Sequence, residues 1–158
     1  MGMSKHPPVT EADFCQKLEY YCAYQERCHK EVEEKLRSLG AIPAMRDKVI
    51  SHLITNNYLN ETRFTTVFTM GKFRIKKWGK NRIQLELKRR GISEWNIRHA
   101  LKQIPPEDYH ATFEALVTQL QQKYEGVSSP QLKKKKIHDA LLYRGWETPL
   151  IFEALREI

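Results

Sequence analysis

The sequence has few of the residues that define several classes of protein. Its 158 residues contain only 7 Gly, 7 Pro and 3 Cys, which excludes collagen-like, proline-rich and disulfide-stapled chains. No apolar run approaches the roughly 20 residues that a membrane span requires. The first ten residues also lack the apolar segment of a secretion signal. We therefore expect a cytoplasmic protein that has no contact with a membrane.

Residue patterns typical of metal sites and catalytic sites are also missing. Cys15, Cys22 and Cys28 form no C-x-x-C pair, and adding His29 as a fourth ligand gives a spacing unlike that of structural zinc sites. The histidines form no H-x-x-x-H pair, and the chain has no P-loop, G-x-S-x-G or G-x-G-x-x-G motif. We expect buried thiols in a reducing compartment, with no metal, no cofactor and no enzymatic activity.

The positive charge is concentrated in one short segment. The formal net charge is +8, while hydrophobic residues make up 41% of the chain and are numerous enough to form a core. Residues 71–91 hold nine basic residues and one acid, Glu86, whereas basic and acidic residues balance on either side of this segment. Charge focused in this way indicates an electrostatic contact with a polyanion or an acidic protein surface.

An internal repeat is anchored on three glycines, Gly40, Gly91 and Gly145. Five columns aligned on these glycines, at −8, −4, +9, +10 and +13, are apolar throughout: Val32, Ile83 and Ile137; Leu36, Leu87 and Leu141; Val49, Ala100 and Ala154; Ile50, Leu101 and Leu155; Leu53, Ile104 and Ile158. The spacing predicts a helix that ends at each glycine, followed by a second amphipathic helix. Ser93 is a predicted N-cap of one such helix.

A third apolar stripe precedes each pair of helices, so each unit is predicted to contain three. The stripes comprise Leu18, Tyr21 and Cys22; Phe64, Val67, Phe68 and Gly71; and Phe113, Leu116, Val117 and Leu120. Residues 64–70 are rich in β-formers, but their apolar period favours a helix. The predicted helices span 11–25, 28–39, 43–56, 60–75, 79–90, 93–103, 106–123, 130–144 and 147–157.

The predicted fold is an all-α, elongated, curved tandem array of three three-helix repeats, because units of this size gain stability by stacking. The divisions are a flexible tail at 1–10, then repeats at 11–58, 59–104 and 105–158. Nothing resembles a dimerisation seam, so we expect a monomer.

The basic residues of the middle repeat, together with one from the third, are the predicted binding residues: Lys72, Arg74, Lys76, Lys77, Lys80, Arg82, Lys88, Arg89, Arg90 and Arg144. A solvated helix face is the alternative for the basic segment, and it is an equal alternative for the run from Lys133 to Lys136. Trp78 either stacks on a base or fills the core. Arg90 and Arg144 occupy equivalent positions, which favours a repeated role as a helix cap or a partner contact.

Three motifs resemble those of the bacterial RecX family, whose members modulate the recombinase RecA. NYLNETRF, from Asn57 to Phe64, is similar to the family's Gly-Tyr-(Ile/Leu)-(Asp/Asn)-Asp-x-Arg-(Phe/Tyr), with Asn57 and Glu61 as departures. GKNRIQLELKRRGI resembles G-x-x-R-I-x-x-E-L-x-x-K-G-(I/V), and KIHDALLYRGW resembles the C-terminal family motif. The residues that carry the match structurally are Tyr58, Arg63, Phe64, Gly79, Glu86, Gly91 and Gly145.

The resemblance implies a three-repeat array that binds in the groove of a RecA–DNA filament. It also implies inhibition of filament growth, ATPase, strand exchange and coprotease activity, with weak binding to single- or double-stranded DNA. A DNA-binding module of helix-turn-helix type is the alternative function, because three-helix units resemble that fold and a basic helix can enter the major groove.

Overall fold

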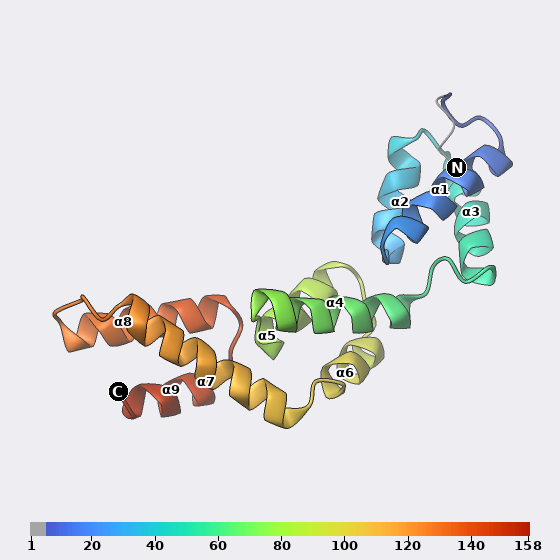
Figure 1. Cartoon of the computed structure of the whole chain (residues 1–158). Coiled ribbons are helices and arrows are strands. Elements are labelled where there is room, and N and C mark those ends of the chain that lie inside the picture. The colour runs from blue at the N-terminus through green and yellow to red at the C-terminus, as the bar shows by residue number, and fades with distance from the viewer. Residues whose placement is uncertain (1–5) are drawn as a thin grey trace.

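The fold is an elongated succession of α-helices, seen in a computed structural model that describes residues 6–158. The predicted tail at 1–10 falls partly on residues 1–5, which lie outside the described residues. Nine helices occur between residues 6 and 158, and no strand: α1 Glu11–Tyr24, α2 His29–Ser38, α3 Pro43–Thr55, α4 Glu61–Lys76, α5 Lys80–Arg89, α6 Glu94–Lys102, α7 Pro106–Lys123, α8 Pro130–Tyr143 and α9 Thr148–Arg156. Each end lies within one residue of its prediction. Residues 64–70 are therefore helical (Figure 1).

The three glycines end their helices with the same geometry. Gly40, Gly91 and Gly145 have φ values of 86°, 72° and 86°, a left-handed conformation that glycine adopts without penalty. Each glycine amide donates to a carbonyl three residues earlier, at 3.0 Å in all three turns. The next amide, from Ala41, Ile92 or Trp146, donates five residues back at 3.0, 3.1 and 3.2 Å. The repeat predicted from sequence is thus a repeat of hydrogen bonds.

Polar residues fix several helix starts. Thr10 forms a capping box with Asp13, and the Asp13 carboxylate accepts the Thr10 amide at 3.1 Å. These backbone hydrogen bonds lower the pKa of Asp13. Asn60, Ser93 and Ser129 accept the amide three residues ahead with their side-chain oxygens. Ser93 is therefore the N-cap that its position predicted.

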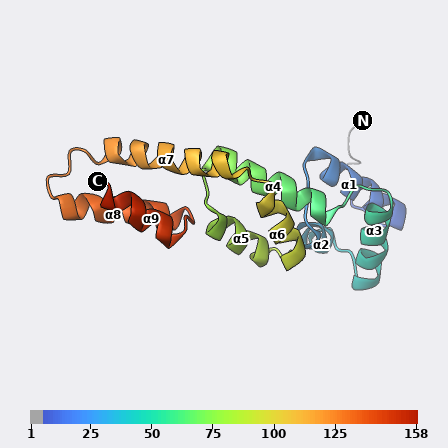
Figure 2. The same cartoon turned by 90° about the horizontal axis from the view of Figure 1, so that it is seen from below.

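The apolar residues gather into two cores along the chain, and the molecule is long and bent (Figures 1 and 2). One core belongs to α1–α3, and the other runs through α4–α9. The repeat columns at −8 and −4 are fully buried in every unit. Cys28 precedes α2 but belongs to the second core, so the first unit is packed onto the second.

The buried face of α4 differs from the predicted stripe. Phe64 is buried as expected, but Val67 is 53% exposed, and Thr65 and Thr69 are buried instead. The Thr65 hydroxyl donates to the carbonyl of Glu61 at 2.7 Å, so its polar atom is satisfied by its own helix. Small threonine side chains on α4, which packs against α6, take the place that the prediction gave to larger apolar ones.

The three units are not packed identically. In the first two, the first and third helices pack together, α1 on α3 and α4 on α6. In the third, the main contacts join α7 to α8 and α8 to α9. Among residues 6–158, no helix is long and apolar enough to cross a membrane.

Candidate functional site

The start of α5, in the second unit, is hydrogen-bonded to the end of α8, in the third unit. The Gly79 amide donates to the Arg144 carbonyl at 2.8 Å, and the Asn81 amide donates to the Gly145 carbonyl at 3.0 Å. The free amides at the start of one helix are thus satisfied by carbonyls from the end of another, an arrangement that also suits the two helix dipoles. Trp146, fully buried, donates its indole N–H to the carbonyl of Lys77 at 3.1 Å.

A second set of contacts fixes α5 and α4 to the first unit. The ammonium of Lys30, on α2, donates to the carbonyl of Arg89 at 3.1 Å. Arg63 pairs with Glu26 at 2.6 Å and donates to both the side chain and the backbone carbonyl of Asn57 at 3.0 Å. Asn57 has φ 63°, which an asparagine tolerates where the family motif has glycine.

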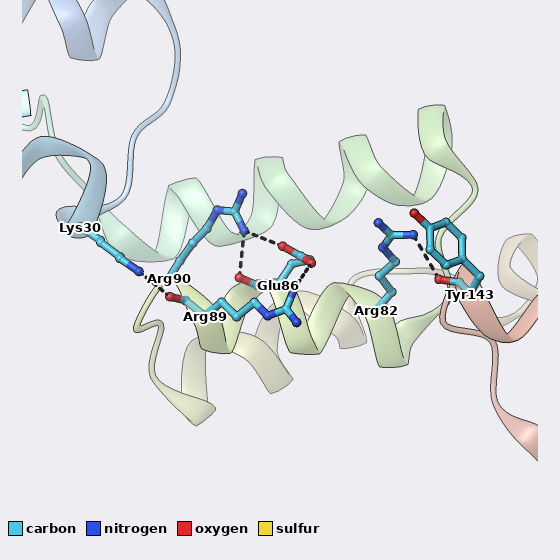
Figure 3. Close-up of polar contacts among 6 residues, drawn as sticks. All are labelled: Lys30, Arg82, Glu86, Arg89, Arg90 and Tyr143. Atoms are coloured by element: carbon cyan, nitrogen blue, oxygen red, sulfur yellow. Dashed lines mark hydrogen bonds and ion pairs between the residues drawn. The ribbon is translucent and has the colours of Figure 1, made fainter. Parts of the chain in front are cut away.

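One side of α5 carries three arginines around a single acid (Figure 3). Arg89 and Arg90 each bond a different carboxylate oxygen of Glu86, at 3.0 and 3.2 Å. Arg82 lies toward the start of the same helix and donates to the carbonyl of Tyr143 at 3.1 Å. Since one carboxylate serves two guanidinium groups, this side of α5 keeps a net positive charge.

Aromatic rings separate these cations. The Arg82 guanidinium lies over both Trp78 and Tyr143, at 4.3 and 4.5 Å from the ring centres. Lys72 lies 5.1 Å from the Trp78 ring, and Phe68 lies between Lys72 and Arg90 at 5.4 and 4.7 Å. We call the four basic residues Lys72, Arg82, Arg89 and Arg90 the cationic face. Trp78 is half-buried: it packs against the second core and also presents its ring to Lys72 and Arg82.

The other predicted basic residues lie elsewhere. Lys88 lines a separate crevice between α5 and α6 together with Arg98. The Lys80 ammonium lies over the Tyr109 ring at 4.7 Å. Arg74, Lys76 and Lys77 are exposed around the end of α4. The nine basic residues of 71–91 therefore divide among four places, of which the cationic face is the one where several cations alternate with aromatic rings.

Arg90 and Arg144 repeat one contact. Each guanidinium donates to a carbonyl four residues earlier, Glu86 at 2.9 Å and Ala140 at 3.2 Å. Of the two roles left open by the sequence, helix capping is the one both residues share. Arg90 adds the contacts to Glu86 and Phe68 that place it on the cationic face.

Two contributors to this site were not predicted from sequence. Tyr143 is 72% exposed and comes from the third unit, and Lys30 comes from the first. Leu85 and Leu142 are also exposed beside Tyr143, where a cleft of about 310 Å³ separates α5 from the end of α8. An aromatic residue directly before the arginine–glycine pair was the available signal for Tyr143, but its neighbour across the junction was not readable from one sequence.

Burial keeps several titratable side chains in their protonated forms. Burial raises the pKa of Cys22 and Cys28 to about 11, so both thiols are protonated at neutral pH. Burial and a hydrogen bond to Glu147 raise the pKa of Tyr109, whose oxygen also accepts the Lys80 amide at 2.9 Å. Between residues 6 and 158, no three His, Cys, Asp or Glu side chains come together as a metal site.

Known proteins resemble this chain in sequence over most of its length. A family model described as the second three-helix domain of RecX matches residues 60–101. The regulatory protein RecX of Bacillus cytotoxicus is 30% identical over 138 residues, which cover 87% of this chain and 51% of that protein. RecX of Bacillus cereus is 26% identical over the same shares. The chain spans about half the length of the curated relatives it matches.

Solved structures resemble it in fold. The crystal structure of RecX from Lactobacillus salivarius superimposes with a TM-score of 0.79 at 25% identity, covering 93% of this chain and 95% of that one. A second RecX crystal structure gives a TM-score of 0.81 over 94% of this chain and 72% of that one, with 18% identity. The resemblance inferred from three motifs is confirmed, and so is the helical repeat architecture.

Proposed function

Because the chain belongs to the RecX family of regulatory proteins, we propose that it binds the RecA–DNA filament and inhibits the activities of RecA. Inhibition would act on filament growth, ATPase, strand exchange and coprotease activity. The protein would act as a cytoplasmic monomer and without catalysis of its own. The observation that supports this function is the cationic face, which adds interleaved aromatic rings to a concentration of positive charge.

The arrangement suits a partner that contains both nucleic acid and protein. Arginines offer bidentate contacts to phosphates, and aromatic rings offer flat surfaces on which bases or side chains stack. The exposed Leu85, Leu142 and Tyr143 lie beside Arg82 and provide apolar area that a duplex alone would leave unused. The elongated shape spreads these contacts along one direction, as binding along a filament groove requires (Figure 2).

A helix-turn-helix DNA-binding module is the second candidate. It is favoured by the three-helix units and by basic residues on α5. It requires α5 to enter a major groove, but Glu86 lies among the arginines of that face and α8 meets its start. Both features obstruct base contacts by α5, so we place the filament first.

The test is a titration of the purified chain into RecA-coated single-stranded DNA while ATP turnover is followed. The double variant Arg82→Glu with Arg89→Glu removes charge from the cationic face and leaves the helix-capping Arg90 intact. We expect its half-inhibitory concentration to rise by at least about tenfold, since loss of close charge pairs typically weakens binding by more than 1.4 kcal/mol.

Two matched variants carry the same change in net charge. Lys88→Glu with Arg98→Glu alters the crevice between α5 and α6, and Lys48→Glu with Lys102→Glu alters exposed lysines elsewhere. We expect both to inhibit ATP turnover within about threefold of the parent chain, because diffuse surface charge contributes little. Undiminished inhibition by the Arg82 and Arg89 variant would remove the cationic face from the mechanism, and no inhibition by the parent chain would refute the function.

A further inference from the structure

The last helix of the third unit leaves repeat positions uncovered that the other units bury. Positions +9 and +13 are Val49 and Leu53 in the first unit, where both are fully buried. Their equivalents Ala154 and Ile158 are only half-buried. They line a groove of about 600 Å³ between α7 and α9, which we call the α7–α9 groove. The third unit is therefore built on the same apolar pattern but has an open core.

In the other two units, polar side chains of the first and third helices bond one another. In the first, Glu19 on α1 pairs with His52 on α3 at 2.6 Å. In the second, Asn96 on α6 bonds Thr62 at 2.7 Å and Glu61 at 2.9 Å on α4. In the third unit, Tyr109 on α7 donates to Glu147, the N-cap residue of α9. Between residues of α7 and α9 themselves, the described part of the chain (6–158) has no side-chain hydrogen bond or ion pair. The floor of the groove is apolar: Phe113, Val117, Leu150, Ala154 and Ile158.

Acidic residues stand on both sides of this apolar floor. Glu114 comes from α7, and Glu153 and Glu157 come from α9. The residues that line the groove include no Lys or Arg, although the chain as a whole carries a net charge of +8. Glu114 pairs with His110 at 2.9 Å. Within the described chain, the carboxylates of Glu153 and Glu157 have no hydrogen-bond or ion-pair partner, which leaves them available to cations of a ligand.

We propose that the α7–α9 groove binds an amphipathic helix of a partner protein, with apolar side chains on the floor and Lys or Arg side chains between the carboxylates. The lining residues of α7 run from His110 to Gln121, about 17 Å of helix, which matches about three turns of a bound helix. Charge complementarity selects a basic helix over an acidic one. The proposal goes beyond the function above, because it concerns a different surface of opposite charge.

The test uses two synthetic 14-residue peptides and the full chain, without RecA or DNA. Both peptides carry leucines at helical spacing, and the other positions are all Lys in one and all Glu in the other. Fluorescence anisotropy measures their binding. We expect the Lys peptide to bind about tenfold more tightly than the Glu peptide, and the difference to shrink as salt rises. Equal or reversed affinities would overturn the proposal.

The variant Glu153→Lys with Glu157→Lys should reverse the preference between the peptides. Its matched control, Glu34→Lys with Glu125→Lys, makes the same change in net charge at exposed carboxylates outside the groove and should keep the preference for Lys. If the control loses the preference as well, the binding is diffuse and the groove is not the site. A reversal requires a folded protein, so this readout separates loss of the site from loss of the fold.

Filling the groove gives an independent check. Ala154→Phe should abolish binding of the Lys peptide while the helical circular dichroism is retained, because the new ring occupies the floor. Sedimentation of the parent chain then identifies the occupant. Self-association that Ala154→Phe removes would mean that a second copy fills the groove, and this would overturn the assignment to a partner helix.

Discussion

Gly79 lies so close to Gly145 that a Cβ atom on Gly79 would stand 2.5 Å from the Gly145 carbonyl oxygen. A Cβ on Gly145 would in turn stand 2.2 Å from the backbone nitrogen of Arg82. The second and third units thus meet through their backbones, and glycine is required on both sides. Two of the three glycines in the family motifs therefore hold the junction that positions Arg82.

Three Gly→Ala substitutions should separate the cost of a positive φ from the cost of a steric clash with the backbone. Gly126→Ala meets no atom within 4 Å and should change the free energy of unfolding by less than about 0.5 kcal/mol. Gly91→Ala has open space but φ 72°, so it should lose about 1–2 kcal/mol. Gly145→Ala adds a backbone clash and should lose about 2–5 kcal/mol. Urea unfolding followed by circular dichroism measures the order, and equal effects at Gly91 and Gly145 would contradict it.

Arg63 should be essential to the joint between the first and second units. Its guanidinium satisfies Glu26, whose other carboxylate oxygen is buried without a partner, and two acceptors on Asn57. Arg63→Ala leaves that carboxylate unpaired, so we expect a loss of about 2–3 kcal/mol in free energy of unfolding. Arg63→Ala combined with Glu26→Gln should recover part of this loss in chemical denaturation. A double variant less stable than Arg63→Ala would show that the pair is not the cause.

The salt dependence of direct DNA binding should show whether the cationic face contacts phosphates. If Arg82 and Arg89 each contact a phosphate, reversing both should reduce the slope of log affinity against log salt by about 1.4 on single strands and about 1.8 on duplex. Anisotropy titrations with labelled oligonucleotides between 50 and 200 mM salt provide the slopes. Lys48→Glu with Lys102→Glu serves as the charge-matched control, and an equal reduction there would indicate diffuse attraction only.

The thiols should be inert in the folded chain. The pKa of Cys22 and Cys28 rises from 9.0 to about 11 on burial, so the thiolate fraction at pH 8 falls by about a hundredfold. Labelling with dithiobis(nitrobenzoate) should be slow in buffer and fast in urea. A fast stoichiometric phase in buffer would contradict the buried positions.

The same shift has a consequence for stability. A folded pKa above the unfolded value favours the folded state while both thiols are protonated. This contribution is therefore complete below pH 9 and is lost as the pH rises through about 11. The urea midpoint should fall over that interval, and Cys22→Ala should reduce the fall. An identical pH profile in the variant would assign the fall to other groups.

Much of the fold was predictable because the sequence repeats the same buried apolar positions and the same glycine turn three times. Ile83 and Leu87 were placed on a buried face by spacing alone, and Gly91 by the αL turn that must follow them. The stripe on α4 was wrong at Val67, because pattern analysis favours large apolar residues. Thr65 is buried with its hydroxyl satisfied locally, which no apolar period reveals.

The candidate site was predictable in charge but not in arrangement. The count of basic residues located it on the middle unit, yet Arg82 and Lys88 lie in different places on α5. Contacts between units, such as Lys30 with the Arg89 carbonyl, depend on how whole bundles stack. The open position of Ile158 has the same origin, since a repeat column predicts an apolar residue but not that a neighbour covers it.

The backbone contact between Gly79 and Gly145 leaves little freedom for the third unit to swing relative to the second. The cationic face and the acidic α7–α9 groove, which carry opposite charges, are thereby held at a fixed separation and orientation. A ligand assembly that binds both surfaces at once would be selected by the spacing of its own subunits, independently of the affinity of either surface alone.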